Sequence, residues 1–454
     1  MELPDKDTPE FLVEGQDGPA VRNRCGKRVN ARAVWLSESL DLKKGDRVAL
    51  VATSDQPSIE TIFACLKLGL ELLLLPEGAS VEELGDLVRR AKSILVLGDA
   101  PMLGIPSLPI PTKLEKIEQA FSLDLESRIL FPTSGSSGPS KIAIHKLSSL
   151  LEVAKASNQV TGLEGCDNWL LTLPLNHVGG FSVLLRVVLA GAKLSVPERQ
   201  GLSRLSENFL FFSPSHISLV PVMLKELVES EIELDFSTLK AALVSGDALS
   251  SNLTLAAVQT GIPVLTSYGS TEVGSTAFSN TIVDADPAIS SYGNPLAGIE
   301  IKIIDSGEIA LRGPNLFLGY LGEEADYSSR WFATGDLGEI DSAGRLSLKG
   351  RKSRVIISGG ENVHPEEIES VARQVEGVEE AIVVAESDQK WGQRPVLLVK
   401  AIGASEDLEQ RLLHRMKESL SEFKMPSAIR VVEKFKYLAN GKLCLLYTSD
   451  AADE

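Results

Sequence analysis

The sequence predicts an α/β protein with a large N-terminal domain, which includes a β-rich subdomain, and a small α+β C-terminal domain. Over roughly the first 300 residues, short aliphatic runs alternate with amphipathic stretches, which is typical of βαβ units with parallel-rich sheets layered between helices. Beyond residue 299, apolar and polar residues alternate as in antiparallel strands. The basic segment 350–354 then precedes a second, shorter α+β pattern. We therefore place the domain boundary there, giving domains 1–350 and 351–454.

The elements of the N-terminal domain follow from the spacing of its apolar residues. Continuous aliphatic runs predict strands, because parallel strands covered on both faces are apolar throughout. Such runs lie at 47–52, 93–97, 169–173, 239–244 and 264–266. Apolar residues three or four positions apart predict amphipathic helices. These helices lie at 59–68, 81–92 and 181–190 and from residue 252 onward.

The rest of the chain is richer in strands. Alternating residues predict strands at 299–304 and 307–311 and a hairpin over 338–346 that turns at 342–344. After the boundary we expect a strand at 355–357, a helix from Pro365, strands at 381–385 and 396–401, and a helix at 408–420. Proline suits the first turn of a helix, where its missing N–H group costs no hydrogen bond.

Composition and charge exclude several classes of protein. At 454 residues the chain is too long for a single compact core. Its net charge of −17 argues against a nucleic-acid partner or an anionic membrane surface. The four cysteines form no C-x-x-C pair, the apolar runs fall short of the roughly 20 residues that span a bilayer, and the N-terminus has no leader pattern. We therefore expect a cytoplasmic protein without a membrane span.

A loop rich in hydroxyl groups follows the apolar run 129–131 and has the chemistry of a phosphate cradle. Its glycines let backbone N–H groups approach an anion, and its hydroxyls and lysine add donors and positive charge. It is not a Walker A loop, because two residues rather than four separate Gly135 from Gly138. The alternative is a flexible surface loop. The residues predicted to bind phosphate are Thr133, Ser134, Gly135, Ser136, Ser137, Gly138 and Lys141.

Five further segments accompany this loop, at 174–180, 268–272, 334–336, 350–351 and 440–442. In their order and spacing, and over nearly the whole chain, they resemble the acyl-adenylate-forming (AMP-binding) superfamily. The resemblance implies an ATP-dependent acid–CoA ligase that forms an acyl-adenylate and then a thioester. Its substrates and cofactors would be a carboxylic acid, ATP, Mg²⁺ and CoA.

The resemblance implies that most of the predicted site residues bind ATP. Thr271 would contact phosphate, and Glu272 would hold Mg²⁺, which prefers oxygen ligands. Asp336 would accept the ribose hydroxyls, and Arg351 would also reach the ribose. For Glu272 and Asp336 the alternatives are a solvated loop carboxylate and a turn-forming aspartate. The remaining ATP-binding residues, several of them along the adenine, are Ser245, Gly246, Asp247, Ala248, Tyr268, Gly269 and Ser270, and the alternative for Tyr268 is a buried tyrosine at a strand end.

Other residues resemble the catalytic and CoA-binding positions of the superfamily. Lys442 matches the lysine between the acid and the α-phosphate, where its charge would stabilise the transition state; the alternative is an exposed lysine after an Asn-Gly turn. His177 matches a position that lines the acyl pocket, although a lone histidine near a helix start is more often structural. Gly359 and Gly360 resemble the loop that approaches the pantetheine arm of CoA. Ser353 stands where the superfamily usually has Asp or Lys, at the hinge about which the small, mobile domain would rotate.

Within the superfamily, the chain is most similar to the o-succinylbenzoate–CoA ligases of menaquinone biosynthesis, along 167–180, 184–186, 218–221 and 391–395. Their substrate is a dicarboxylate, so Arg186, inside an apolar helix, is the predicted partner of the carboxylate that does not react. His177 and Gly269 would also contact the acyl group. The alternative for Arg186 is a guanidinium that reaches solvent while its stem lies on the core.

Two other functions stay open from the sequence. One is a ligase for another aryl or fatty acid, and the other is a non-catalytic nucleotide-binding relative. The second arises because the residues after Lys442 differ from the superfamily's usual final helix, so we expect a truncated or non-native end that holds Lys442 poorly. The sequence does not fix the oligomeric state, and a homodimer is compatible with it.

Overall fold

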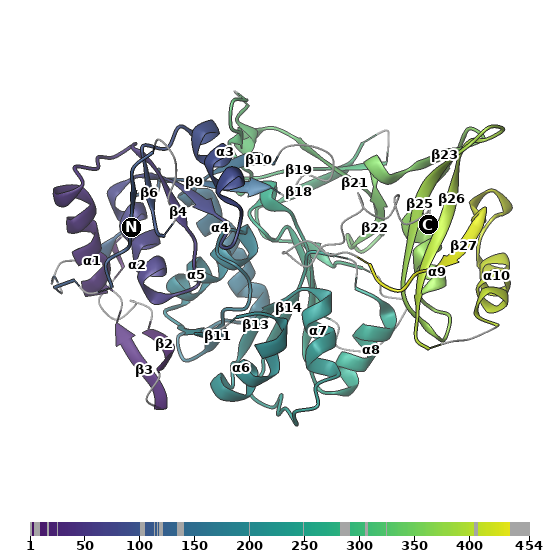
Figure 1. Cartoon of the computed structure of the whole chain (residues 1–454), viewed down its shortest axis with the longest axis horizontal. Helices are drawn as coiled ribbons and strands as arrows, with labels where there is room; N and C mark the ends of the chain where they lie inside the picture. Colours follow the sequence, from purple (N-terminus) through teal and green to yellow (C-terminus); the bar gives the residue numbers. More distant parts are fainter. Residues whose placement is uncertain are drawn as a thin grey trace.

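The computed structural model confirms the predicted fold class, an α/β chain with parallel-rich sheets and a small C-terminal α+β unit. Figure 1 shows this unit at one end of the molecule and helix α1 (Gly26–Val34) at the other. The structure describes residues 2–3, 10–15, 18–24, 26–99, 105–112, 114–115, 117, 121–133, 140–198, 200–247, 249–281, 291–304, 307–323, 325–403 and 407–435.

A seven-stranded sheet, of order β20-β10-β9-β5-β4-β6-β7, contains the first strands of the large domain. The strands β4, β5, β6, β7 and β9 run parallel, whereas β10 and β20 are antiparallel to their neighbours. The bounds are β4 (Arg47–Val51), β5 (Glu71–Leu75), β6 (Leu95–Leu97), β7 (Ser107–Leu108), β9 (Arg128–Thr133), β10 (Lys141–Lys146) and β20 (Gly319–Tyr320). Helices α2 (Gln56–Leu68) and α3 (Val81–Ala91) connect these strands and begin at the side-chain caps Asp55 and Ser80.

A nine-stranded sheet has the order β17-β16-β15-β14-β13-β11-β12-β2-β3 and is parallel from β15 to β2. Its strands are β2 (Glu10–Gly15), β3 (Gly18–Arg24), β11 (Asn168–Leu170), β12 (Lys193–Val196), β13 (His216–Leu219), β14 (Ala241–Val244), β15 (Val264–Tyr268), β16 (Phe278–Thr281) and β17 (Asn294–Pro295). Its helices are α4 (Leu147–Thr161), α5 (Val178–Ala190), α6 (Leu205–Phe212), α7 (Pro221–Val228) and α8 (Ser251–Gln259). One continuous core joins the two sheets through side chains of α2, α4 and α5.

The C-terminal third contains two smaller sheets. The first is antiparallel and comprises β18 (Glu300–Ile303), β19 (Glu308–Arg312), β21 (Phe332–Ile340) and β22 (Leu346–Arg351). The second comprises β23 (Ile356–Ser358), β24 (Glu361–Val363), β25 (Val378–Asp388), β26 (Gly392–Ala401) and β27 (Ala428–Val431), covered by α9 (Pro365–Ala372) and α10 (Leu408–Ser419). The short helix η5 (Lys352–Arg354) links the two sheets. The predicted boundary falls at the end of β22.

The remaining elements are short: β1 (Glu2–Leu3), β8 (Phe121–Ser122), η1 (Trp35–Ser39), η2 (Leu202–Arg204), η3 (Thr271–Val273), η4 (Tyr327–Ser329) and η6 (Glu422–Lys424). Helices of the described ranges are all too short or too polar to cross a bilayer. Several predicted bounds were wrong by three or four residues. Helix α2 begins at Gln56 instead of 59, β25 runs from Val378 to Asp388 instead of 381–385, and β26 begins at Gly392 instead of 396. Helix α5 begins at Val178 instead of 181, and β11 ends at Leu170 instead of 173. The early start of α5 needs Gly180, because a Cβ there would collide with the Pro174 carbonyl.

Candidate functional site

Three of the predicted site segments lie at one edge of the nine-stranded sheet. The segments at 174–180, 245–247 and 269–273 follow β11, β14 and β15, which are parallel, so their carboxyl ends meet at this edge. At Gly269 the backbone passes so close to the next turn that a Cβ would collide with the Ser275 carbonyl. Gly246 has a φ of +96°, which favours glycine, and Asp247 beside it is exposed.

Asp336 is buried and lies at the centre of a polar cluster with Tyr268 and Arg351. The Tyr268 hydroxyl donates to Asp336 Oδ2 at 2.7 Å, and Arg351 Nε lies 2.7 Å from Asp336 Oδ1. The strand register explains the second contact, because Asp336 of β21 pairs with Arg351 of β22. Burial, followed by the charge of Asp336, raises the pKa of Tyr268 well above its usual value, so the phenol stays a donor. The carboxylate is therefore fixed in direction before any ligand arrives.

Tyr268 is 7% exposed, and its ring lies near Phe278 and Tyr292, with centroids 6.0 and 6.1 Å away. This burial agrees with the alternative of a tyrosine that closes a strand end, and stacking on adenine stays a prediction.

A second cluster surrounds Glu272, in the short helix η3. His145 Nε2 donates to the Thr271 carbonyl at 2.7 Å, and the Phe317 N–H group donates to the Glu272 carbonyl at 3.0 Å. The Tyr320 hydroxyl donates to the Glu272 carboxylate at 2.5 Å. Burial lowers the pKa of His145 from 6.5 to about 4, so its imidazole is neutral at physiological pH. Both the backbone and the side chain of Glu272 are thus held in place.

The predicted phosphate loop begins and ends in the β9–β10 hairpin. Thr133 and Lys141 are opposite each other in the register, and the Thr133 hydroxyl donates to the Lys141 carbonyl at 3.2 Å. The Ser140 hydroxyl closes the same end by donating to the Thr133 carbonyl at 2.6 Å. The Lys141 ammonium lies 4.5 Å from the centroid of the Tyr320 ring. Ser134, Gly135, Ser136, Ser137 and Gly138 lie outside the described residues, as do Ala248 and Lys442.

Arg186 is fully buried in α5, with an exposure of 1%. Its Nη2 donates to the Thr276 hydroxyl at 3.2 Å, and its guanidinium carbon lies 5.3 Å from the centroid of the Trp169 ring. In the described part of the chain no carboxylate lies within ion-pair distance of Arg186, and its Nε has no hydrogen-bond partner. The alternative in which the guanidinium reaches solvent is therefore wrong. Burial lowers the pKa of Arg186 to about 10, because the interior disfavours the charged form.

His177 lies at the N-cap of α5 and is half-buried. It thus occupies the start of the helix that contains Arg186, nine positions earlier in the sequence.

The predicted hinge residue, Ser353, has an ion-paired residue on each side. Lys352 Nζ lies 2.8 Å from Glu308 Oε2, and the other oxygen of Glu308 accepts from the Gly335 N–H group at 2.9 Å. On the other side, Arg354 lies 2.9 Å from Glu366 and 2.6 Å from Glu369.

The Gly359–Gly360 turn has positive φ at both positions. The Gly359 N–H group donates to the Trp391 carbonyl at 2.9 Å, and a Cβ at Gly359 would collide with the Trp391 ring. Figure 1 places β23, which precedes this turn, toward the outer end of the small domain.

Sequence reasoning missed His145, Tyr320, Thr276 and Glu308. His145 gave a weak signal, since it interrupts the apolar alternation of a strand with a residue that the structure buries completely. The other three contact their partners across 48, 90 and 44 positions, and no local pattern predicts such contacts.

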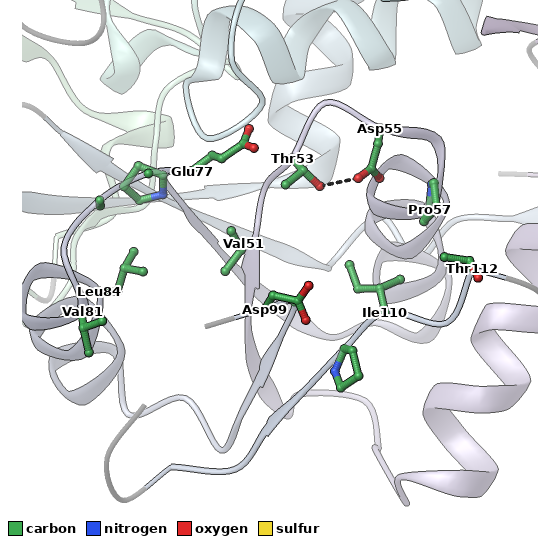
Figure 2. Close-up of a pocket in the computed structure, with 15 residues that line it drawn as sticks. Val51, Thr53, Asp55, Pro57, Glu77, Val81, Leu84, Asp99, Ile110 and Thr112 are labelled. Atoms are coloured by element: carbon green, nitrogen blue, oxygen red, sulfur yellow. Dashed lines mark hydrogen bonds between the residues drawn. The ribbon is translucent and has the colours of Figure 1, made fainter. Parts of the chain in front are cut away.

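Two further features do not join the site. A cavity of about 540 Å³ lies at the carboxyl ends of β4 to β7, and Asp55, Glu77 and Asp99 line it (Figure 2). These carboxylates disfavour a phosphate ligand.

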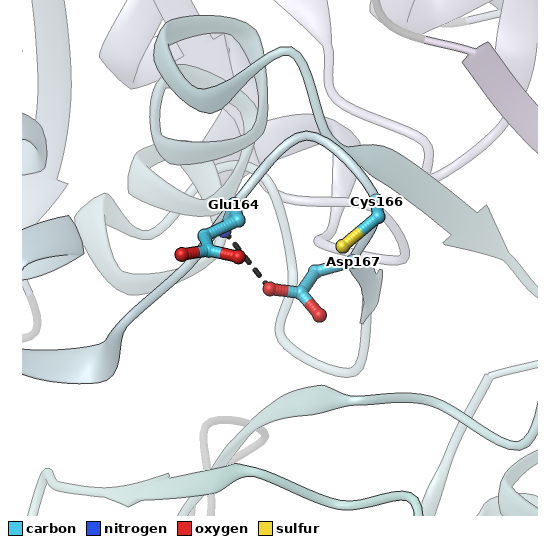
Figure 3. A group of neighbouring side chains, drawn as sticks. All are labelled: Glu164, Cys166 and Asp167. Atoms are coloured by element: carbon cyan, nitrogen blue, oxygen red, sulfur yellow. Dashed lines mark hydrogen bonds between the residues drawn. The ribbon is translucent and has the colours of Figure 1, made fainter.

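Glu164, Cys166 and Asp167 lie close together on one turn (Figure 3). Asp167 accepts from the Glu164 N–H group at 2.9 Å and pairs with Lys240 at 2.7 Å, so this carboxylate stabilises the turn before β11.

Comparisons with known proteins agree with this arrangement. The profile of the AMP-binding enzyme family matches residues 23–321, and that of the AMP-binding enzyme C-terminal domain matches residues 367–442. A 2-succinylbenzoate–CoA ligase of Listeria monocytogenes is 31% identical over 417 residues, which cover 89% of each chain. The corresponding ligase of Enterococcus faecalis is 30% identical over 423 residues, which cover 87% of each chain.

Solved structures resemble the chain over nearly its whole length. The o-succinylbenzoate-CoA synthetase of Bacillus subtilis, in complex with its acyl-adenylate intermediate, superimposes with a TM-score of 0.85 at 26% identity and covers 99% of both chains. The same synthetase in complex with ATP and magnesium gives a TM-score of 0.83 at 26% identity and covers 98% of this chain and 99% of that one.

Proposed function

Because this chain belongs to the AMP-binding enzyme family, we propose that it is an AMP-forming ligase that joins 2-succinylbenzoate (o-succinylbenzoate) to CoA. A carboxylate oxygen of the acid attacks the α-phosphorus of ATP, which forms the acyl-adenylate anhydride and releases pyrophosphate. The CoA sulfur then attacks the acyl carbon, loses its proton, and displaces AMP to give the thioester. The anhydride supplies a good leaving group, and the protein supplies positioning and charge stabilisation.

The observation that carries the proposal is the buried cation of Arg186. A guanidinium without an anionic partner is costly in the core, and a substrate carboxylate would relieve that cost through bidentate hydrogen bonds. A dicarboxylate such as 2-succinylbenzoate leaves one carboxylate for this pairing while the other reacts. Thr276 holds the guanidinium in place, and His177 and Gly269 would complete the acyl pocket. A fatty-acid ligase, the first alternative, has no use for a buried cation here.

For ATP, the Asp336 cluster supplies an oriented carboxylate for the ribose hydroxyls, with Arg351 beside it. Tyr268, Ser270 and the Ser245–Ala248 segment would contact the adenine and the α-phosphate side. The loop from Thr133 to Lys141 would enclose the β and γ phosphates, together with Thr271. Glu272 is the residue that would hold Mg²⁺, which neutralises phosphate charge when bound. Its carboxylate fits this role, because it is held in direction and lies near the base of the phosphate loop.

The thioester step requires a rotation of the small domain, in which the loop of Gly359 and Gly360 replaces Lys442 at the reacting centre. Ser353 is the proposed hinge residue. In support, Lys352 pairs with Glu308 of the large domain, whereas Arg354 pairs with Glu366 and Glu369 of the small domain. The domain limits 1–350 and 351–454, a cytoplasmic location and a homodimer stay predictions.

The deciding experiment measures AMP and thioester formation from ATP, CoA and 2-succinylbenzoate, with benzoate and octanoate as matched controls. We expect turnover with the dicarboxylate to exceed turnover with either monocarboxylate by orders of magnitude. Equal turnover with benzoate would indicate a general aryl ligase. ATP binding without pyrophosphate release, for any of the three acids, would indicate a non-catalytic relative.

A further inference from the structure

Tyr320 contacts two residues that the proposed function assigns to different parts of MgATP. Its hydroxyl donates to the Glu272 carboxylate at 2.5 Å, and its ring lies 4.5 Å below the Lys141 ammonium. The register of the sheet brings these residues together, because β20 pairs with β10 immediately after the phosphate loop. One side chain therefore connects the proposed magnesium carboxylate with the lysine of the loop.

The contact is specific to the carboxylate of Glu272. The backbone of η3 is held separately, by His145 at Thr271, by Phe317 at Glu272 and by the Asn315 amide at Val273. Within the described part of the chain, the Tyr320 phenol is the one group that donates a hydrogen bond to this carboxylate. Loss of the phenol would thus leave η3 in place and free only the side chain of Glu272.

The Tyr320 ring itself is held firmly. Phe317 packs against it edge-on, with centroids 5.0 Å apart, and Phe317 in turn stacks on Tyr327 at 5.0 Å. The phenol is the donor in its contact with Glu272, because an ionised carboxylate can only accept hydrogen bonds.

We propose that Tyr320 is a positioning residue for magnesium binding, an inference that rests on the proposed function because it takes Glu272 as the magnesium ligand. Because the phenol occupies one oxygen of Glu272, the other oxygen would remain available to hold Mg²⁺. Because the Lys141 ammonium lies over the Tyr320 ring, the ring also keeps this ammonium near Glu272. Partners of this kind orient metal ligands, and their loss typically weakens metal affinity roughly 10- to 100-fold.

The test compares Tyr320→Phe with Tyr327→Phe in magnesium titrations of pyrophosphate release and of ATP binding by calorimetry. Tyr320→Phe keeps the ring under Lys141 and removes only the donor, and Tyr327→Phe removes a phenol from the same aromatic cluster. For Tyr320→Phe we expect the half-saturating Mg²⁺ concentration to rise roughly 10- to 100-fold. Magnesium-free ATP binding should stay within twofold of wild type, and the Tyr327→Phe control should match wild type in both titrations. An unchanged magnesium midpoint in Tyr320→Phe overturns the proposal.

A double-mutant cycle separates positioning from general loss of structure. In a Glu272→Ala background the Tyr320→Phe change should no longer move the magnesium midpoint, because the carboxylate that accepts from the phenol is absent. An equal shift in both backgrounds would also overturn the proposal, even if Tyr320→Phe lowers the melting temperature. Failure of wild type to release pyrophosphate with any acid would instead remove the proposed function, and the calorimetric titration would still decide the role of Tyr320.

Discussion

Replacing Arg186 by methionine should change stability and substrate binding in opposite directions. Methionine keeps an unbranched side chain in the core and removes the charge. Without ligand, the buried guanidinium is bonded to Thr276 but has no carboxylate partner among the described residues. The charge therefore destabilises the free protein, and under the proposed function it would stabilise the complex with the dicarboxylate.

The magnitudes follow from the structure. Burial lowers the pKa of Arg186 from 12.5 to about 10, so keeping this residue charged in the fold costs on the order of 3 kcal/mol. Loss of the hydrogen bond to Thr276 and of packing on Trp169 offsets part of this gain, by about 1–2 kcal/mol. The free energy of unfolding should thus rise by about 1–2 kcal/mol. Loss of a buried charge partner weakens binding by about 2–5 kcal/mol, which corresponds to an increase of roughly 30-fold or more in the KM for 2-succinylbenzoate.

Two assays check this pair of effects. Urea unfolding of the ligand-free protein gives the change in stability, and initial rates at varied 2-succinylbenzoate and varied ATP give the two KM values. The KM for ATP should stay within about threefold of wild type, since Arg186 lies in the proposed acyl pocket. A variant that is less stable than wild type and has an unchanged KM for the acid would refute the reasoning, because Arg186 would then be a structural residue.

The remaining predictions concern the backbone of the site, its pH dependence and the hinge. The pKa of His145 falls from 6.5 to about 4 on folding, so protonation of its imidazole opposes folding. Above pH 6.5 the neutral imidazole contributes fully to the stability of the fold. This contribution, on the order of 3 kcal/mol, is lost as pH falls from 6.5 through 4. Urea unfolding of His145→Gln should therefore show a shallower loss between pH 6.5 and 4 than wild type, and parallel curves would contradict this. Gly269→Ala should reduce the rate of pyrophosphate release roughly 100-fold. The alanine Cβ would collide with the Ser275 carbonyl and displace the segment that leads to Thr271. Activity near that of wild type would show that the turn can relax. Ser353→Pro should slow thioester formation by roughly tenfold or more, while the rate of ATP–pyrophosphate exchange changes little, because proline fixes φ at the proposed hinge. Equal losses in the two assays would contradict a hinge role.

The fold and the motif positions could be predicted from the sequence because both depend on local patterns. Aliphatic runs gave the parallel strands. The structure then showed that the carboxyl ends of β11, β14 and β15 meet at one edge, where the segments that follow them gather. The polar contacts could not be predicted. Tyr320 and Glu272 are 48 positions apart in the sequence, and His145 and Thr271 are 126 positions apart. The spacing of apolar residues identifies a buried position, but it does not identify the residue that the buried side chain contacts. For Arg186 the sequence left two readings open, and only its burial decided between them.

At the proposed hinge, long-range ion pairs explain how the chain accommodates serine at position 353, where the superfamily usually has Asp or Lys. Serine at position 353 lacks the charge that the superfamily usually has there, and the sequence offered Lys352 or Arg354 as a substitute. In the structure these two residues pair in opposite directions, Lys352 with Glu308 and Arg354 with Glu366 and Glu369. Under the proposed hinge role, a rotation about Ser353 would leave these three ion pairs intact, because none of them spans position 353. The proposed rotation would instead break the contact between Lys225 Nζ and Glu379 Oε1, 3.2 Å apart, which spans position 353.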